Sequence, residues 1–362
     1  MIRYKLPEYP CKKDVWDTLS EERRPIVVYG MGNGADKLFD RFEKYGITVA
    51  EVFASDGFVR GHSYRGYKVL SFSDIKEKYS DFVIVLSFAS NRSEVIEMFS
   101  DIDKKHDMYI PDMPVANIEE YFDREFYNAN YDRIRAVYDM LADDESKNIY
   151  SAVLNYKLTG RLSYLLDSCS DKAEMYSLIS NKKIRSVIDA GAYNGDTARE
   201  AEEYFPSLES IYAIEPDKRN FKKLSKYAEE SKCNMTARNA AVWCECSEGV
   251  FMGSGNRNSS ISSTASYENR VAECELITID CLGLSPDYIK YDVEGAELEA
   301  LTGSLETIRR STPSLLVSIY HRSRDIFSLA ELLRDNTEGY KFYIRRLPSV
   351  PAWELNLILI HA

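Results

Sequence analysis

The sequence predicts an α/β protein with two open, mainly parallel sheets joined by helices. Short apolar runs alternate with helix-like segments in the first third and again in the last half of the chain. A glycine-rich turn follows the first strand-like run of each part, at Gly30 and at Gly191. Such alternation is typical of parallel sheets covered by helices on both faces. We therefore expect two α/β domains, residues 1–116 and 182–362, with a helical connector at 117–181.

The N-terminal domain is expected to be a small Rossmann-like unit. Its first strand runs into the turn GMGNGA, which satisfies the G-x-G-x-x-A spacing, and Asp56 ends the second strand. This spacing is typical of dinucleotide-binding turns, although the motif alone is weak. Two interpretations stay open: a nucleotide site, or a structural module without a ligand. The residues of such a site would be Gly30, Gly32, Gly34 and Asp56.

The connector differs in character from both flanking domains. Aromatic residues and leucines recur there at helical spacing, without the alternation of a strand. We expect several helices that join or cover the two sheets. The aromatic residues are expected in the core rather than on a substrate surface.

The last half of the chain is expected to end in an antiparallel hairpin. Its two final strand-like runs are YKFYIRRL and ELNLILIHA, and only a short proline-containing loop separates them. Such a loop is too short for a parallel crossover helix. Further upstream, the stretch GSGNRNSSISSTAS lacks a core pattern and is expected to be a surface insertion or a lid.

Composition excludes several classes of protein. The net charge is −12 and no basic tract occurs, so no nucleic-acid partner is expected. No apolar run approaches the roughly 18 residues of a membrane span, and the N-terminus has no apolar signal region. A cytoplasmic location is therefore expected. The seven cysteines are scattered, with one close pair at Cys244 and Cys246, which favours reduced thiols and no structural metal.

The segment SVIDAGAYNGDT predicts a site for a nucleoside-containing cofactor. Asp189 closes a buried strand, Gly191 and Gly195 form a turn, and Asn194 or Asp196 can cap the following helix. A second acid, Glu215, ends the next apolar run, where a carboxylate would reach a ribose diol.

Three further residues are candidates for chemistry on a second substrate. Asp292 ends the strand YIKYD, and Glu294 follows it beside a glycine. His321 ends the apolar strand LLVSIY, and an imidazole is a natural base near neutral pH. Asp292 and Glu294 could instead hold a divalent metal, but two carboxylates without a clear third ligand are a weak signal. Glu297 and Glu299 are expected on a solvated helix face.

Several of these motifs together resemble the FkbM family of S-adenosylmethionine-dependent methyltransferases. The matching segments are VIDAGAYNGDT, AIEPDKRNFKKL, RNAAVW, IKYDVEGAELEAL and SIYHRSRD, in the family's order across the last half. The resemblance implies a class I methyltransferase fold, S-adenosylmethionine as methyl donor, and methylation of a hydroxyl on a sugar, glycan intermediate or other small molecule. The N-terminal domain is similar to nucleotide-sugar-binding domains that accompany polysaccharide-modifying enzymes.

The resemblance also assigns roles to the candidate residues. Asp292, His321 and Glu294 would act on the acceptor. The donor would be bound by Asp189, Gly191, Tyr193, Asn194, Gly195, Asp196, Glu215 and Ala241. Two other functions stay open: a non-catalytic nucleotide- or nucleotide-sugar-binding protein, and an NAD-dependent oxidoreductase that uses the N-terminal turn.

Overall fold

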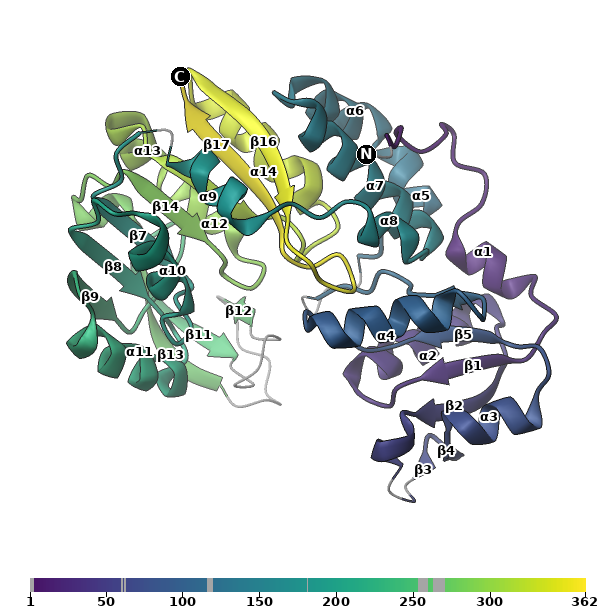
Figure 1. Ribbon diagram of the computed structural model, residues 1–362. Helices are drawn as coiled ribbons and strands as arrows, with labels where there is room; N and C mark the ends of the chain where they lie inside the picture. The colour runs from purple at the N-terminus through teal and green to yellow at the C-terminus, as the bar shows by residue number, and fades with distance from the viewer. Residues whose placement is uncertain are drawn as a thin grey trace.

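The computed structural model describes residues 3–59, 61, 63–115, 120–180, 182–252, 260–262 and 271–362. Figure 1 shows an N-terminal α/β unit, a group of helices, and a C-terminal α/β unit around a larger sheet. The predicted domain boundaries near residues 116 and 181 fall on residues outside these ranges. None of the described helices combines the length and apolar character that a bilayer crossing requires.

The N-terminal sheet has the order β3-β4-β2-β1-β5-β6. Its strands pair in parallel, apart from the antiparallel pair of β3 and β4. The strands are β1 (Ile26–Tyr29), β2 (Val49–Ala54), β3 (Ser63–Tyr64), β4 (Tyr67–Ser71), β5 (Val83–Leu86) and β6 (Met108–Tyr109). The helices are α1 (Val15–Ser20), α2 (Asn33–Tyr45), η1 (Asp56–Phe58), α3 (Phe72–Lys78) and α4 (Ser93–Asp103). The expected parallel α/β unit is confirmed.

The described part of the connector is helical, as expected. It contains α5 (Arg124–Ala129), α6 (Tyr131–Met140), α7 (Asp144–Thr159), α8 (Ser163–Leu166) and α9 (Lys172–Ile179). The side chain of Asp143 caps the start of α7, and Gly160 ends it in a left-handed conformation. Most residues of α7 are buried, Tyr150 and Tyr156 completely. These aromatic residues therefore belong to the core.

The C-terminal sheet has the order β16-β17-β15-β14-β7-β8-β9. Its strands are β7 (Ser186–Ala190), β8 (Ser210–Ile214), β9 (Asn234–Arg238), β14 (Tyr288–Tyr291), β15 (Ser314–Ser318), β16 (Tyr340–Arg346) and β17 (Leu355–His361). The five neighbouring strands β15, β14, β7, β8 and β9 run parallel, whereas β17 is antiparallel to both β15 and β16. The expected terminal hairpin is confirmed, and this topology is that of class I methyltransferases.

The helices of this unit are α10 (Asp196–Tyr204), α11 (Lys218–Glu230), η2 (Asp280–Leu282), α12 (Glu297–Thr302), α13 (Leu305–Ser311) and α14 (Asp325–Asn336). A small second sheet, β10-β13-β11-β12, flanks it. Its strands are β10 (Ala241–Val242), β11 (Ser247–Met252), β12 (Ser260–Ser262) and β13 (Val271–Ile277). The stretch expected as an insertion or lid lies outside the described residues, apart from β12.

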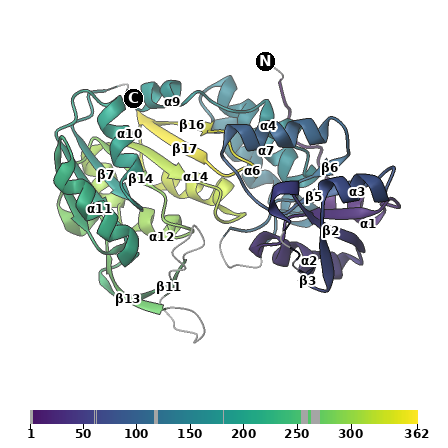
Figure 2. The same cartoon turned by 60° about the horizontal axis from the view of Figure 1, so that its bottom comes forward.

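One apolar core continues through all three parts of the chain. It contains Val27 and Ile84 of the N-terminal sheet, Tyr150 of α7, and Ile188 and Leu315 of the C-terminal sheet. Each sheet has a further apolar cluster on its other face. Figure 2 shows α6 and α7 between the two sheets. The helices therefore form a layer that both sheets share.

Candidate active site

Parallel pairing brings most of the predicted residues to one edge of the C-terminal sheet. Gly191 follows β7, Glu215 follows β8 and Asp292 follows β14. These three strands are neighbours, in the order β14-β7-β8. Open α/β sheets bind ligands at this carboxyl edge.

A cavity of about 530 Å³ opens at this edge. Ligand sites typically occupy 300–1,000 Å³. Seven of the predicted residues line it: Gly191, Tyr193, Asp196, Glu215, Ala241, Asp292 and Glu294. Asp189, Asn194, Gly195 and His321 are not among its lining residues. Candidates of the donor side and of the acceptor side thus share one cavity, and four of them do not line it.

The glycines of the turn after β7 are required by contacts within the chain. A Cβ on Gly191 would stand 1.9 Å from the carbonyl oxygen of Asp292, and the residue has φ +89°. A Cβ on Gly195 would stand 2.7 Å from the ring of Tyr227, at φ +86°. The amides of Gly191 and Ala192 already donate to the carbonyl of Ile214. The turn is therefore held against β14 and β8, and these two amides are not free for a ligand.

The expected helix cap is wrong. Helix α10 has Gly195 at its N-cap, with no side-chain hydrogen bond from the cap residue. Asp196 is the first helical residue, and its carboxylate accepts from the amide of Thr197. The left-handed conformation that the turn requires at residue 195 favours glycine over a capping side chain. Asp196 is thereby left on the cavity wall.

Glu215 is held with its carboxylate at the cavity. Its two oxygens accept the amide N–H groups of Tyr193 and Asp217, at 2.8 and 2.9 Å. Burial raises its pKa to about 8, and the two amides only partly offset this effect. A carboxylate oxygen accepts more than one hydrogen bond, so each can still receive a ligand hydroxyl. Glu215 therefore fits a vicinal diol, such as that of a ribose.

Asp189 lies behind the cavity wall, fully buried, and neither of its oxygens has a hydrogen-bond partner. Burial raises its pKa to about 7, an effect that Lys290 partly offsets. A buried polar group without a partner is costly. Asp189 is therefore an acid without a hydrogen-bond partner behind the turn, paired in register with Lys290 of β14.

Lys290 connects the donor side of the cavity with the acceptor side. Its Nζ donates to Thr197 Oγ1 at 2.9 Å and lies 3.3 Å from Asp292 Oδ2. Burial alone would raise the pKa of Asp292, but Lys290 and then His321 outweigh it and hold that pKa below its ordinary value. Tyr320 Oη also donates to Asp292, at 3.3 Å. Asp292 is therefore an ionised acceptor of hydrogen bonds at the cavity wall.

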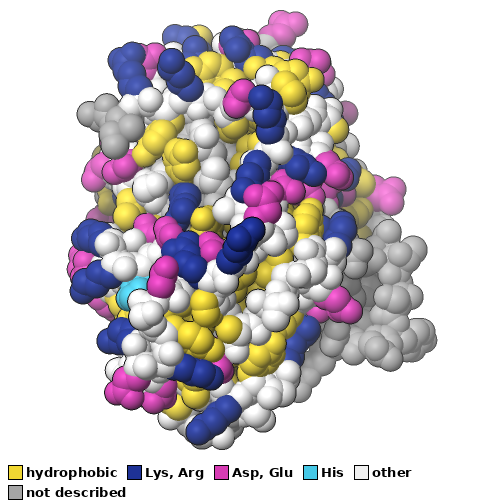
Figure 3. Space-filling view, turned by 90° about the vertical axis from the view of Figure 1, so that its right-hand side faces the viewer, with side chains coloured by type: hydrophobic (Ala, Val, Ile, Leu, Met, Phe, Trp, Pro, Cys, Tyr) yellow, Lys and Arg dark blue, Asp and Glu magenta, His cyan; other side chains and the backbone are white. Residues whose placement is uncertain are grey.

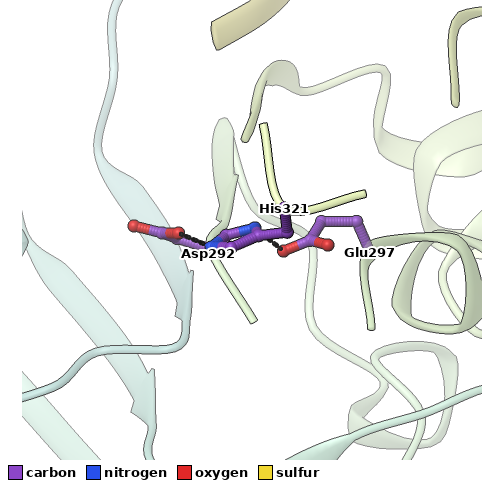
Figure 4. Close-up of side chains that lie close together, drawn as sticks. All are labelled: Asp292, Glu297 and His321. Atoms are coloured by element: carbon purple, nitrogen blue, oxygen red, sulfur yellow. Dashed lines mark ion pairs between the residues drawn. The ribbon is translucent and has the colours of Figure 1, made fainter. Parts of the chain in front are cut away.

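His321 is buried behind the two acceptor-side carboxylates and between acids. Its Nε2 lies 3.5 Å from Glu294 Oε2 and 3.7 Å from Asp292 Oδ1, and its Nδ1 lies 3.0 Å from Glu297 Oε1. Figure 4 shows the ring between Asp292 and Glu297, with one nitrogen toward each. Burial would lower the pKa of His321, but Glu297 and Glu294 outweigh this and raise it well above 6.5. These acids therefore favour the protonated, imidazolium form of His321.

Glu297 is not on a solvated helix face, so this expectation is wrong. Its side chain is fully buried, and Oε1 accepts the amides of Val293 at 2.9 Å and Gly295 at 3.4 Å. The loop before α12 folds back over the first helical turn, so its amides need an acceptor there. Its helical spacing predicts an exposed side chain, but Glu297 is instead the buried ion-pair partner of His321.

Asp292, Glu297 and His321 each have a potential metal-ligating atom within 4.8 Å of the others. The imidazole, however, stands between the two carboxylates and directs a different nitrogen to each (Figure 4). Metal ligands must converge on one point. The arrangement fits an ion-paired imidazolium better than a metal centre.

The N-terminal unit also contributes to the cavity wall. Ser90 and Val350 exchange backbone hydrogen bonds of 2.7 and 2.9 Å, which dock the segment after β5 on the β16–β17 loop. Asn91 and Ser93 follow this contact and line the cavity. In Figure 1 the β16–β17 loop points toward α4. The cavity is therefore built by both α/β units.

The turn predicted as an N-terminal nucleotide site is packed against β5. A Cβ on Gly34 would stand 2.1 Å from the carbonyl oxygen of Ser87, and one on Gly30 would stand 2.5 Å from Ser87 Oγ. Gly32 is open. Asp56 accepts from the amide and hydroxyl of Ser73, at 3.2 and 2.8 Å. Packing thus accounts for two of the glycines, and a nucleotide site here stays a prediction.

Five residues of the site were not predicted as site residues from the sequence: Lys290, Glu297, Tyr320, Asn91 and Ser93. A signal existed for Lys290, because it lies two residues before Asp292 in an otherwise apolar strand and so shares its face. Tyr320 is likewise next to His321. The role of Asn91 and Ser93 depends on docking between distant segments, for which the sequence has no local signal.

Comparison with known proteins agrees with this fold. Residues 189–342 match the family model of the methyltransferase FkbM domain. The structure is similar to that of an FkbM methyltransferase from Methylobacillus flagellatus KT, with a TM-score of 0.71 and 18% identity over 98% of this chain and 94% of that one. No curated protein matches the chain.

Weaker similarities concern about half of the chain. An rRNA methylase from Streptococcus thermophilus has a TM-score of 0.33 and 12% identity over 52% of this chain and 93% of its own. Fibrillarin from Aeropyrum pernix, solved with bound S-adenosyl-L-methionine, has a TM-score of 0.32 and 15% identity over 52% and 72%.

The full-length similarity shows that the N-terminal unit and the helical layer belong to a shared fold. The family match includes Asp189, Glu215, Asp292 and His321. Residues 189–342 therefore match a methyltransferase FkbM domain, and the chain around them has the fold of an FkbM methyltransferase.

Proposed function

We propose that the protein transfers a methyl group from S-adenosylmethionine to a hydroxyl of a sugar or glycan intermediate. The observation that carries the proposal is that one cavity is lined both by Glu215, which fits a diol, and by the acids Asp292 and Glu294. S-adenosylmethionine supplies an activated methyl group that needs no acid to help its leaving group depart. The protein's task is then to align the acceptor oxygen and to receive its proton.

On the donor side, Glu215 receives the ribose hydroxyls, and Asp189 lies behind the turn. Gly191, Tyr193 and Asp196 border the methionine end, and Ala241 borders the base. Asn194 and Gly195 act through the shape of the turn rather than by facing the cavity. This division follows from which of the residues line the cavity.

On the acceptor side, Asp292 and Glu294 face the cavity, and one of them takes the hydroxyl proton. Burial raises the pKa of Glu294, whereas Lys290 and His321 lower that of Asp292. Two acids whose surroundings shift their pKa values in opposite directions can take different roles in acid–base catalysis. Asp292 orients the hydroxyl, Glu294 receives the proton, and His321 stabilises both from behind.

The proposal is tested by methyl transfer from labelled S-adenosylmethionine to nucleotide sugars, free sugars and glycan fragments. We expect labelled O-methyl product with wild type, and a loss of about 10²- to 10⁴-fold in Glu294→Gln, the range attributed to a positioned base. Donor binding should survive in this variant. Glu229→Gln, an exposed acid on α11, is the matched control.

Other outcomes would support other functions. Label on nitrogen contradicts O-methylation. Donor binding with no turnover of any acceptor favours a non-catalytic binding protein, and NAD binding without donor binding favours an oxidoreductase.

A further inference from the structure

Two exposed cysteines, far apart in sequence, lie in contact beside the small sheet. Cys246 directly precedes β11, and Cys281 lies in η2, which follows β13. Their Sγ atoms are 3.0 Å apart. This is closer than two non-bonded sulfurs normally approach, so little movement separates the pair from a covalent bond of about 2.05 Å.

The surroundings favour reaction at Cys246. Its thiol is exposed and borders a surface cavity of about 490 Å³. The hydrogen bond with Cys281 is the largest influence on its pKa, followed by a hydrogen bond from the backbone of Thr278, and the two lower it. A thiolate is the nucleophile in disulfide exchange. Cys246 is therefore the attacking thiol and Cys281 the resolving one.

The other nearby cysteines lack this combination. Cys274 borders the same surface cavity, but it is buried, and burial raises its pKa to about 11. Cys244 is exposed, but partial burial of its thiol raises its pKa. The geometry selects one pair among the seven cysteines.

We propose that Cys246 and Cys281 form a reversible disulfide, a modification site independent of the proposed methyl transfer. With oxidised glutathione as the oxidant, the Cys246 thiolate attacks one sulfur, forms a mixed disulfide and releases one glutathione thiolate. The Cys281 thiolate then attacks Cys246 Sγ, forms the intramolecular bond and releases the second glutathione. The two cysteines lose two electrons and two protons, and one oxidised glutathione becomes two reduced molecules.

The disulfide would tie the turn between β10 and β11 to η2. Ala241 and Val242 of β10 line the main cavity, and β10 pairs with β13, whose end leads into η2. The bond therefore fixes the wall of the donor side from behind. None of the residues proposed for methyl transfer takes part in this bond.

The test equilibrates the folded full-length protein with glutathione buffers of decreasing reduced fraction. Free thiols are then counted under denaturing conditions, and the bond is located by peptide mass mapping. We expect wild type to fall from seven thiols to five, with a peptide linked through Cys246 and Cys281, and reduction to restore all seven. Cys281→Ser should retain one glutathione, on Cys246.

Cys244→Ser is the matched control, because it removes a neighbouring exposed thiol and should still lose two thiols on oxidation. Cys246→Ser should lose none. The proposal is overturned if wild type keeps seven thiols across the buffers, or if the linked peptides involve Cys244 or Cys274. Neither result depends on whether the protein binds or uses S-adenosylmethionine.

Discussion

At the scale of single residues, Glu215 couples the candidate donor site to pH. Burial raises its pKa from 4.5 to about 8, so the folded protein keeps a proton that the unfolded chain has already lost in this window. The free protein should therefore lose stability as pH rises from about 4.5 to about 8. Each pKa unit corresponds to about 1.4 kcal/mol of unfolding free energy.

Denaturant unfolding at several pH values, for wild type and Glu215→Gln, measures this contribution. Both proteins contain every other titrating group, Asp189 included, so those contributions cancel in the difference. We expect the wild type to show the steeper decline between pH 5.5 and 8. Parallel curves for the two proteins would mean that Glu215 is not perturbed.

His321 provides a second residue-scale prediction. The acids that face it are Asp292 and Glu294 from the turn after β14, Glu297 from α12 and Asp325 from α14, with Arg322 beside it. Glu297 is the nearest, at 3.0 Å. We expect Glu297→Gln to lower the pKa of His321 measurably, because the closest compensating charge is lost.

The measurement is a nuclear magnetic resonance titration of protein labelled at its four histidines, with the His321 signal assigned from His321→Asn. Glu299→Gln is the control, since Glu299 lies on the same helix and pairs with Arg322. An unchanged His321 pKa in Glu297→Gln would show that the ring is not held by this carboxylate.

Much of this site could be predicted from residues at strand ends. Glu215 and Asp292 stand directly after apolar strands, and parallel pairing alone brings them to one edge. Glu297 was missed because its spacing matches the exposed face of a helix. Only the fold of the preceding loop, with its unpaired amides, turns that carboxylate inward.

At the scale of elements, one buried ion pair connects the helical layer to the N-terminal unit. Lys157 of α7 donates to Asp112, which follows β6, at 2.6 Å, and both side chains are at least 90% buried. Removing one partner of such a pair leaves an uncompensated buried charge and costs about 3–5 kcal/mol. We expect Lys157→Met to destabilise the protein by about this amount.

The double variant Lys157→Met/Asp112→Leu should recover most of the loss, because no charge is left buried. Denaturant unfolding of both single variants and the double variant closes the cycle. A double variant as unstable as Lys157→Met would show that packing, rather than the unpaired carboxylate, causes the loss.

Elements differ in how well sequence predicts them. The strands of both sheets and the terminal hairpin follow from apolar runs and loop length. The cap of α10 does not, because the left-handed turn at Gly195 overrides the capping preference of Asp196. The contact between Ser90 and Val350 has no local signal, since 260 residues of chain separate its partners.

At the scale of the whole molecule, the two α/β units share a core and jointly border the cavity. Asn91 and Ser93 place the N-terminal unit at the edge of the site, next to the loop between β16 and β17. The N-terminal unit is therefore positioned to border an acceptor, and we propose this as its role.

On the face shown in Figure 3, Lys and Arg side chains are interspersed with Asp and Glu rather than gathered in one basic area.

The proposed methyl transfer depends most directly on binding of S-adenosylmethionine. Calorimetric titration of the purified full-length protein with S-adenosylmethionine, and separately with NAD, tests it directly. We expect micromolar binding of S-adenosylmethionine, no binding of NAD, at least tenfold weaker donor binding in Glu215→Gln, and unchanged binding in Glu229→Gln. No detectable binding of S-adenosylmethionine to wild type would contradict the proposed function.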